Sequence, residues 1–501
     1  MFDVAVIGSG YGGAVMAARL APHGRVVLVE RGKRWRPGSF PTSPLGLARA
    51  YLTPKNPLGL WEMRLGAGVG NALVSAYGGA SMMNYGITSQ PEDRIFEAWP
   101  VKANEMAPFF QKALDVLQPE GHPRAAELGD QQFLDRVEPG RRIDLRNTID
   151  WEGCTDCGDC PLGCNEGAKR SLDFTYLSMA EAAGVETILG QQVVDLRPSA
   201  NGAGWALVLR RSDGEALERL EATKVVIAGG TFGTLDLLHD LEDTLPTTRS
   251  FGQRLTMNGD GLAFLYNTRH RLSGHDGAPI TTSVRLPFED DEGKTRSLTV
   301  MSGRIPRSVM RVAGAVLALG AELIPSDRPT SRARRESGVL DRCWRRAKDL
   351  MAVRDGGALS QTYMYKLDGE DQARGTIRFD ARGRSAIHWP DYADDPLMRF
   401  ASARLREWAS RVEGRIVRDL GSWPGMRHFG VHALGGCRMG ASPDEGVVDS
   451  RLRLYRPDGG LYEGLRVVDS SVIPTALGVP SSLTVAALAE RAAKDLLQEL
   501  H

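Results

Sequence analysis

The chain begins with an apolar strand pattern that leads through a glycine-rich turn into a helical pattern. Residues 2–7 form a short apolar run, residues 8–13 read Gly-Ser-Gly-Tyr-Gly-Gly, and residues 14–20 have helical spacing. A second strand pattern, residues 25–30, ends at Glu30. Short apolar runs bounded by turn residues are typical of buried parallel strands. The alternation therefore predicts a β-α-β unit at the start of the chain.

Further along the chain, the pattern predicts a second sheet and a C-terminal helix. Residues 297–301 and 375–379 are short runs with β-branched and aromatic side chains, as strands have. Residues 482–491 carry a helical pattern that continues to the end of the chain. Ser481 or Ser482 would cap the start of this helix.

Composition and charge are those of an ordinary globular protein of 501 residues, 42% hydrophobic and 25% charged. Lysine plus arginine (62) equals aspartate plus glutamate (62), which gives no indication of nucleic-acid binding.

No apolar run reaches the about 18 residues of a membrane-spanning helix. Residues 312–323 are mostly apolar between arginines, which favours a core helix, with contact to a membrane surface as the alternative. A strand pattern from residue 2 predicts no signal peptide and, with clustered cysteines, a cytoplasmic location.

The first turn has the chemistry of a dinucleotide-binding site. Gly8 would allow the tight turn, Gly10 would let the backbone approach a pyrophosphate, and Gly13 would let helix and strand pack closely. The helix N-terminus would face the diphosphate with its partial positive charge. Glu30 would accept hydrogen bonds from the ribose hydroxyls. The motif does not distinguish NAD from FAD, but its place at the extreme N-terminus favours FAD.

Four of the six cysteines stand close together, as Cys154-x2-Cys157-x2-Cys160-x3-Cys164. Four thiolates at this spacing match the ligands of a bacterial-type iron–sulfur cluster, here of the 4Fe–4S or 3Fe–4S kind. Zinc is a weaker alternative, because structural zinc sites separate their ligand pairs more widely. Metal-free thiols are the remaining alternative. A cluster beside a dinucleotide site would carry single electrons.

Glycine-rich segments recur at separated places in the chain: residues 6–30, 78–86, 224–231 and 432–440, the last continued by residues 465–474. Together they resemble the glucose–methanol–choline (GMC) family of flavin oxidoreductases, and within it the cholesterol-oxidase-like branch, here with a cysteine-rich insertion. The resemblance implies an α/β fold, in which a Rossmann-like FAD-binding domain is interwoven with an α+β substrate domain built on an antiparallel sheet.

The resemblance also implies domains made of non-contiguous pieces. The pieces of the FAD-binding domain would be residues 1–90, 165–260 and 428–501. The pieces of the substrate domain would be residues 91–164 and 261–427, with a cysteine-rich loop at residues 151–169.

On this resemblance, His432 matches the family's active-site histidine in a His-x-Leu-Gly-Gly-Cys pattern. An imidazole that titrates near neutrality suits a group that takes the hydroxyl proton of an alcohol. A hydrogen-bonded structural histidine is the alternative, and His428 is interpreted as structural. The chain departs from the family before its last helix, where Pro480-Ser481 stands in place of the usual Asn-Pro. Ser481 or Ser482 is therefore the candidate to hold the substrate oxygen in place of that asparagine.

The segments that resemble the family also identify the residues expected to hold the FAD. The glycine-rich segment of residues 78–86 would lie along the flavin, and the start of the last helix would stabilise the reduced ring. The predicted cofactor-binding residues are Gly8, Gly10, Tyr11, Gly12, Gly13, Glu30, Arg31, Gly79, Ser81, Asn84, Tyr85, Gly86, Val193, Gly229, Asp469, Ser482 and Leu483.

The resemblance and the cysteine run together predict an FAD-dependent oxidoreductase. It would oxidise a bulky, lipophilic, sterol-like alcohol to a carbonyl compound by hydride transfer to flavin N5. Electrons would leave through the cluster to an acceptor protein or quinone, whereas without a cluster oxygen becomes the favoured acceptor. The alternatives are a flavin-containing isomerase or other non-redox enzyme on the same scaffold, and an electron carrier without a substrate alcohol.

Overall fold

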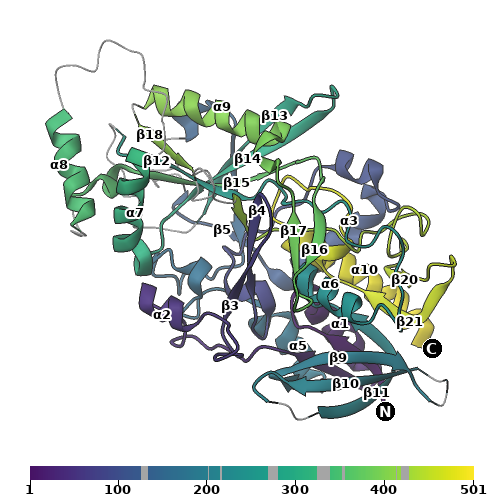
Figure 1. Ribbon diagram of the computed structural model, residues 1–501. Helices are drawn as coiled ribbons and strands as arrows, with labels where there is room; N and C mark the ends of the chain where they lie inside the picture. The colour runs from purple at the N-terminus through teal and green to yellow at the C-terminus, as the bar shows by residue number, and fades with distance from the viewer. Residues whose placement is uncertain are drawn as a thin grey trace.

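The computed structural model describes residues 1–500 apart from 126–133, 201, 203, 215–216, 269–279, 324–338, 352–355, 413 and 419–427. Two large sheets organise this part of the chain, one of eight strands and one of six. Figure 1 shows the first sheet near both chain ends and the second sheet beyond it, beside α7 and α8. The predicted mixed architecture, with a Rossmann-like part interwoven with an antiparallel sheet, is confirmed.

The eight-stranded sheet combines the beginning, middle and end of the chain. Its strand order is β20-β21-β11-β1-β2-β8, and β9 and β10 extend it from β11. The pairs around β1 are parallel, whereas β9, β10 and β11 form an antiparallel extension. The strand bounds are β1 Phe2–Ile7, β2 Val26–Glu30, β8 Glu186–Leu189, β9 Gln191–Pro198, β10 Trp205–Arg211, β11 Leu217–Ile227, β20 Arg453–Tyr455 and β21 Leu461–Val467.

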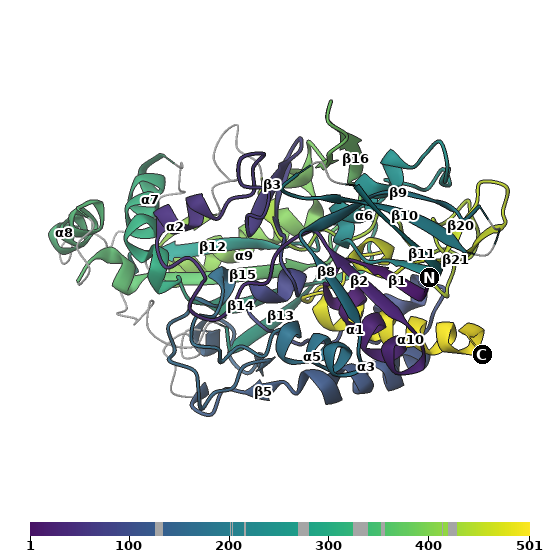
Figure 2. The ribbon, with the colours of Figure 1, turned by 90° about the horizontal axis from the view of Figure 1, so that it is seen from below.

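Helices cover both faces of this sheet, with α1, α5 and α10 on one face and α6 on the other (Figure 2). The predicted first helix begins at Tyr11 rather than at residue 14, because Gly12 and Gly13 already belong to it. Low helix propensity of glycine hid this first turn from the sequence pattern. The predicted C-terminal helix is present and begins at Ser482. The bounds are α1 Tyr11–Leu20, α3 Ala103–Leu117, α5 Tyr176–Ala182, α6 Gly230–Asp240 and α10 Ser482–Leu500.

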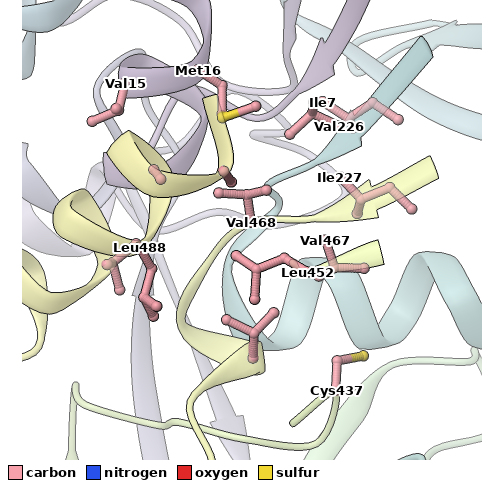
Figure 3. Packing of buried hydrophobic residues seen from close by; sticks show 14 of the residues in the cluster. Ile7, Val15, Met16, Val226, Ile227, Cys437, Leu452, Val467, Val468 and Leu488 are labelled. Carbon is pink, nitrogen blue, oxygen red and sulfur yellow. The ribbon is translucent and has the colours of Figure 1, made fainter. Parts of the chain in front are cut away.

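The core of the first sheet joins these elements through apolar side chains. Figure 3 shows Met16 of α1 and Leu488 of α10 gathered with Val226 and Ile227 of β11 around Val468. All of these side chains are buried. Burial of this apolar area is what holds the interleaved segments of the chain together.

A buried ion pair connects three helices on one face of the sheet. Glu490 of α10 accepts hydrogen bonds from Arg19 of α1, with Nη2 at 2.7 Å, and from the Tyr176 hydroxyl of α5, also at 2.7 Å. Glu490 is 3% exposed. Replacing it with alanine leaves both donors without their acceptor, so we expect the free energy of unfolding in urea to fall by about 2–3 kcal/mol.

The exposed Glu407 on α9 (Pro396–Arg411) provides the matched control for this stability experiment. It pairs with Arg404 at 2.7 Å and with Arg411 on the same helix, and its side chain is 43% exposed. Its replacement by alanine is expected to change the free energy of unfolding by less than about 1 kcal/mol. Equal losses in the two variants would contradict a special role for the buried pair.

The six-stranded sheet is antiparallel throughout, in the order β18-β12-β15-β14-β13-β6. Helix α9 covers one face, where Leu405 and Trp408 belong to the same core as Tyr365 and Leu367 of β15. The predicted strand at 297–301 lies within β14. The bounds are β6 Arg142–Asp144, β12 Gly261–Tyr266, β13 Thr282–Glu289, β14 Thr295–Gly303, β15 Tyr363–Gly369 and β18 Arg415–Arg418.

The other predicted strand, residues 375–379, is β16 (Thr376–Phe379), and it lies outside the six-stranded sheet. Among the residues that the structure describes, it pairs with β17 (Ser385–His388) as a two-stranded ribbon. The preceding strand in the chain, β15, belongs to the six-stranded sheet and ends at Gly369. Between the two strands, Asp371 accepts hydrogen bonds from the Met257–Asp260 turn, so the chain leaves the sheet there. The β pattern was interpreted correctly, but its sheet was not.

Helices α7 (Met310–Leu323) and α8 (Val339–Leu350) pack on each other at one end of the six-stranded sheet. The predicted apolar helix is thus present in α7, where Leu317 and Ala318 are buried while Val312 and Leu319 are exposed. No helix among the described residues is both long and apolar enough to cross a membrane.

The domain boundaries and the cytoplasmic location stay predictions. Other elements are α2 Pro44–Arg49, β3 Trp61–Leu65, β4 Val69–Val74, β5 Glu120–Gly121, β7 Arg146–Asn147 and β19 His428–Gly430.

Candidate active site

The turn between β1 and α1 is tightly built on one side and open on the other. Gly8 has φ +101°, and a Cβ atom there would lie 2.3 Å from the Ala228 carbonyl oxygen. Gly12 is equally enclosed, since a Cβ atom would lie 1.7 Å from the Val468 carbonyl oxygen. At Gly10, which precedes α1, an added Cβ would meet nothing within 4 Å, and no side chain caps the helix. A free helix start beside an open glycine is the environment that a diphosphate requires.

Glu30 lies at the end of β2, directly beside this turn. Its carboxylate accepts hydrogen bonds from Ser9 N at 3.1 Å and Ser9 Oγ at 2.6 Å, and from Gly32 N at 2.8 Å. Ser9 Oγ also accepts from Gly78 N at 3.0 Å, which ties the predicted flavin segment to the turn. The Arg31 guanidinium donates to Glu62 at 2.8 Å, and it also interacts electrostatically with Glu30.

Three separated segments meet at the start of α1. Asn84 Nδ2 donates to the Tyr11 hydroxyl at 2.9 Å, and Ser482 at the start of α10 lies close enough to this hydroxyl to act on its pKa. A Cβ atom at Gly79 would lie 2.9 Å from the Gly10 Cα atom, so the two glycine-rich loops touch. Burial raises the pKa of Tyr11, although Asn84 and Ser482 act against this rise. Residues predicted from two N-terminal segments and from the start of the C-terminal helix are therefore neighbours.

Asp469 fastens the end of β11 to the C-terminal segment. Its buried carboxylate accepts hydrogen bonds from Gly230 N at 3.0 Å and Thr234 Oγ1 at 2.5 Å, and from Ser471 N at 2.8 Å. Burial raises the pKa of Asp469. The predicted residue Gly229 precedes α6 in this same junction.

The remaining predicted flavin residues have internal positions. Ser81 Oγ donates to the Gly78 carbonyl at 2.7 Å and accepts from Leu172 N at 3.2 Å, so its hydroxyl holds the loop itself. A Cβ atom at Gly86 would lie 2.8 Å from Thr148 Oγ1. Buried or half-buried side chains fill the other positions, which are Tyr85, Val193 and Leu483.

His432 follows β19, which pairs in parallel with β4. Its ring Nδ1 lies 2.8 Å from Asp368 Oδ1, and its backbone N donates to Asp260 Oδ2 at 3.1 Å. Lys366 Nζ lies 2.7 Å from Asp368 Oδ1 and 3.0 Å from Asp260 Oδ1. Within the described part of the chain, Nε2 of His432 has no hydrogen-bond partner. His428 has a structural position, because its Nε2 lies 3.0 Å from the Asp260 carbonyl oxygen.

The charges around His432 are buried and mutually compensating. Asp260 is 3% exposed, and although burial acts to raise its pKa, Lys366 and His432 lower that pKa to about 2. The two carboxylates raise the pKa of Lys366 against the effect of its burial. Asp260, Asp368 and His432 place one ligand atom each within 4.8 Å of one another, as a metal site would. The Lys366 ammonium lies between the carboxylates and takes the place of a cation.

The sequence interpretation missed Asp260, Lys366 and Asp368 as parts of this site. A signal was present in β15, where Lys366 and Asp368 alternate with Tyr365 and Leu367 of the core. Alternate strand residues share a face, so the two charges face away from α9 and toward His432. A lysine and an aspartate two residues apart in an otherwise apolar strand indicate a buried ion pair.

Pro480, where the chain departs from the family's Asn-Pro, follows a residue whose carbonyl contacts the polar side chain of Asn258. Asn258, in the same turn as Asp260, donates from Nδ2 to the Val479 carbonyl at 2.8 Å, and its Oδ1 accepts from Leu477 N at 2.7 Å. Ser481 precedes α10 and contributes its carbonyl to Val485 N at 3.0 Å. One turn, residues 257–260, therefore holds both His432 and the segment before α10.

The four clustered cysteines are free thiols near the predicted flavin segment. Cys160 is buried and the other three are half-buried. Burial raises the pKa of Cys160, and Lys169 acts against this rise while the other three cysteines add to it. Among the described residues, no three of the four sulfur atoms lie within 4.8 Å of one another.

A buried lysine ties the cysteine loop to the predicted flavin segment. Lys169 is 2% exposed, and its Nζ donates to the carbonyl oxygens of Cys160 at 2.9 Å, Met82 at 2.7 Å and Asn84 at 3.1 Å. The pKa of Tyr85 is raised by burial and also by Cys160 and Asp260. The Tyr85 phenol is therefore close enough to interact with both the cysteine loop and the His432 site.

Comparisons of sequence and structure relate this chain to known proteins. Two models described as GMC oxidoreductase, for the N- and C-terminal parts of the family, match residues 67–240 and 371–489. A cholesterol oxidase of Mycobacterium tuberculosis is 27% identical over 98% of this chain and 90% of its own length. A long-chain-alcohol oxidase of Arabidopsis thaliana is 25% identical over 96% of this chain and 65% of its own length. The crystal structure of pyridoxine 4-oxidase from Mesorbium loti has a TM-score of 0.64 at 18% identity, covering 98% of both chains.

Proposed function

Because this chain belongs to the GMC oxidoreductase family, we propose that it is an FAD-dependent enzyme that oxidises an alcohol to a carbonyl compound. The observation that carries the proposal is the environment of His432, a ring held at Nδ1 by a buried carboxylate and without a partner at Nε2 among the described residues. A basic nitrogen presented in this way suits removal of a hydroxyl proton.

The residues of the first turn fit the cofactor. The open face at Gly10 and the uncapped start of α1 would accept the diphosphate, and Glu30 would accept the ribose hydroxyls. Tyr11, Asn84 and Ser482 would border the flavin, because their side chains meet beside that turn. When bound, FAD supplies a two-electron acceptor for the hydride of the carbinol carbon.

His432 would take the other hydrogen of the alcohol. The hydroxyl proton would pass to Nε2 as the C–O double bond forms, so that one hydride and one proton leave the substrate. The Asp368 carboxylate at 2.8 Å would stabilise the charged ring that results. Ser481 is the candidate to orient the substrate oxygen, in place of the family's asparagine.

Visible spectroscopy tests this function directly. The purified protein should show flavin absorbance, and anaerobic mixing with an alcohol substrate should bleach it. A flavin-containing isomerase or other non-redox enzyme would keep its absorbance while converting substrate. A protein that stays colourless after incubation with FAD would overturn the proposal.

A lipophilic alcohol is the substrate class that we propose. Its support is the similarity of nearly the whole of this chain to a cholesterol oxidase and to a long-chain-alcohol oxidase. The test compares kcat/KM for cholesterol, for a long-chain primary alcohol and for glucose. A preference for glucose would contradict the assignment.

Contact with a membrane surface is proposed with the same substrate class. The apolar side chains Val312 and Leu319 of α7 and Trp344 and Leu350 of α8 are exposed, and Lys348 lies over the Trp344 ring at 5.9 Å. Exposed apolar and basic side chains together favour an anionic lipid surface. Sedimentation with anionic vesicles should capture the protein, and Trp344→Ser should weaken that capture.

For the electrons, we propose an exit through an iron–sulfur cluster on Cys154, Cys157, Cys160 and Cys164. Support comes from their spacing, their free thiols and the bonds of Lys169 from Cys160 to the predicted flavin segment. The cluster would supply one-electron steps to an acceptor protein or quinone. Anaerobically purified protein should contain iron and acid-labile sulfide. An iron-free protein with full activity would leave the cysteines as metal-free thiols and oxygen as the favoured acceptor.

A further inference from the structure

The ring of His432 is held in one orientation and one tautomer by groups outside its own segment. A carboxylate only accepts hydrogen bonds, so the contact of 2.8 Å between Asp368 Oδ1 and Nδ1 requires a proton on Nδ1. The Lys366 ammonium is 3.5 Å from the same nitrogen, but it only donates and cannot accept that proton. In the neutral ring, Nε2 then carries the free electron pair.

The backbone and the ring of His432 are each held by a carboxylate, and both carboxylates pair with Lys366. Asp260 accepts the backbone N–H groups of His432, at 3.1 Å, and of Val431, whereas Asp368 binds the ring. Lys366 bridges the two carboxylates at 3.0 Å and 2.7 Å. Without the ammonium, the two buried carboxylates would repel each other, and neither would keep its position.

The charge balance of the cluster changes with the protonation of His432. Two carboxylates and one ammonium leave one negative charge when the ring is neutral, and none when the ring is protonated. Lys366 is 4% exposed and Asp368 is fully buried, so water screens these charges poorly. The net charge of the cluster is therefore smallest when Nε2 carries a proton.

We propose that Lys366, Asp368 and Asp260 are positioning residues, which present His432 with Nδ1 protonated and Nε2 as the proton acceptor. This inference rests on the proposed function of His432. It adds three residues that act on the reaction through the ring of His432 and are not expected to touch the substrate or the FAD. The cluster of a lysine between two aspartates thus sets the tautomer and the orientation of the active-site ring.

The first test observes the tautomer in the intact holoenzyme. In protein labelled with 15N at histidine, the His432 signals should show a protonated Nδ1 and an unprotonated Nε2 above the titration of the ring. Asp368→Ala should abolish this preference and lower kcat at least about tenfold with little change in KM, since it removes the hydrogen bond that fixes the ring. A wild-type ring protonated at Nε2 instead would overturn the inference, whatever the activity.

Asp290→Ala provides the matched control in the same sheet. Asp290 is also a buried aspartate with an ion pair, to Arg296 at 2.5 Å, but it lies at the turn between β13 and β14. Its replacement should leave the His432 signals and kcat unchanged. If Asp368→Ala and Asp290→Ala behave alike while His432→Ala is inactive, the positioning role is wrong and the proposed function stands.

The second test changes the charge of the cluster. Lys366→Met leaves two carboxylates beside His432, so the ring should hold its proton more tightly, and the acidic limb of kcat/KM against pH should move upward by about one unit or more. Lys366→Arg should restore the wild-type limb. An unchanged limb in a folded Lys366→Met variant would overturn the inference, and the tautomer experiment decides the matter if that variant does not fold.

Other titrating groups near the cluster are the same in every variant. They are the Tyr85 phenol, which interacts with Asp260, the His428 ring at the Asp260 carbonyl, and Asp371, which holds the turn of Asp260. Burial, together with the neighbouring Asp395, raises the pKa of Asp371 to about 7, so Asp371 contributes its own titration near neutrality. The test therefore compares the midpoint of the acidic limb of kcat/KM between variant and wild type and does not interpret the absolute value of that midpoint.

Discussion

Replacing His432 with alanine is expected to lower the turnover of an alcohol substrate about a hundredfold or more while FAD stays bound. The variant loses the Nε2 atom that would take the hydroxyl proton, so the step that forms the carbonyl slows. The residues beside the predicted FAD turn do not depend on this ring, since Glu30 and Tyr11 are held by other partners. Anaerobic flavin reduction by stopped-flow absorbance measures the step, and the flavin content of the purified variant measures binding.

His428→Gln is the matched control for this experiment. His428 lies four residues before His432 and contacts the Asp260 carbonyl oxygen at 3.0 Å, a bond that a glutamine amide can donate in its place. We expect this variant to reduce its flavin at close to the wild-type rate. Near-normal reduction in His432→Ala would instead remove His432 from the proposed mechanism.

Replacing Gly10 with alanine is expected to lower the affinity for FAD about a hundredfold or more without unfolding the protein. The chain itself leaves room for this methyl group, since an added Cβ would meet nothing within 4 Å, and the φ of −67° at Gly10 suits alanine. A diphosphate drawn against the start of α1 would need the same space. Loss of two charge-assisted hydrogen bonds to the phosphates would cost about 3–6 kcal/mol.

Gly12 separates this effect from a general effect of filling the turn. There an added Cβ would lie 1.7 Å from the Val468 carbonyl oxygen, so Gly12→Ala should misfold with or without FAD. Circular dichroism and thermal unfolding of the apoprotein should therefore show a native fold for Gly10→Ala and a disrupted fold for Gly12→Ala. Gly10→Ala protein that binds FAD normally would contradict the proposed position of the diphosphate.

Local patterns were sufficient for the elements of the first sheet. Apolar runs of five or six residues around a glycine-rich turn predicted β1 and β2 to within a residue, because short buried strands leave a continuous apolar signal. The start of α1 was predicted three residues late, since Gly12 and Gly13 resemble turn residues although they are helical. The strand at residues 376–379 was recognised, but its partner β17 was not, because a strand pattern carries no information about which strand lies next to it.

For the active site, the sequence by itself determined the motifs: the turn at Gly8–Gly13, Glu30 after the second strand, the cysteine run and the candidate His432. Only the tertiary structure decided what surrounds them. It brought Asp260 from one turn and Lys366 and Asp368 from another strand to the ring of His432, and it turned the Arg31 side chain toward Glu62. The physical reason is that motifs are local in the chain, whereas ion pairs form between side chains far apart in sequence that the fold buries together.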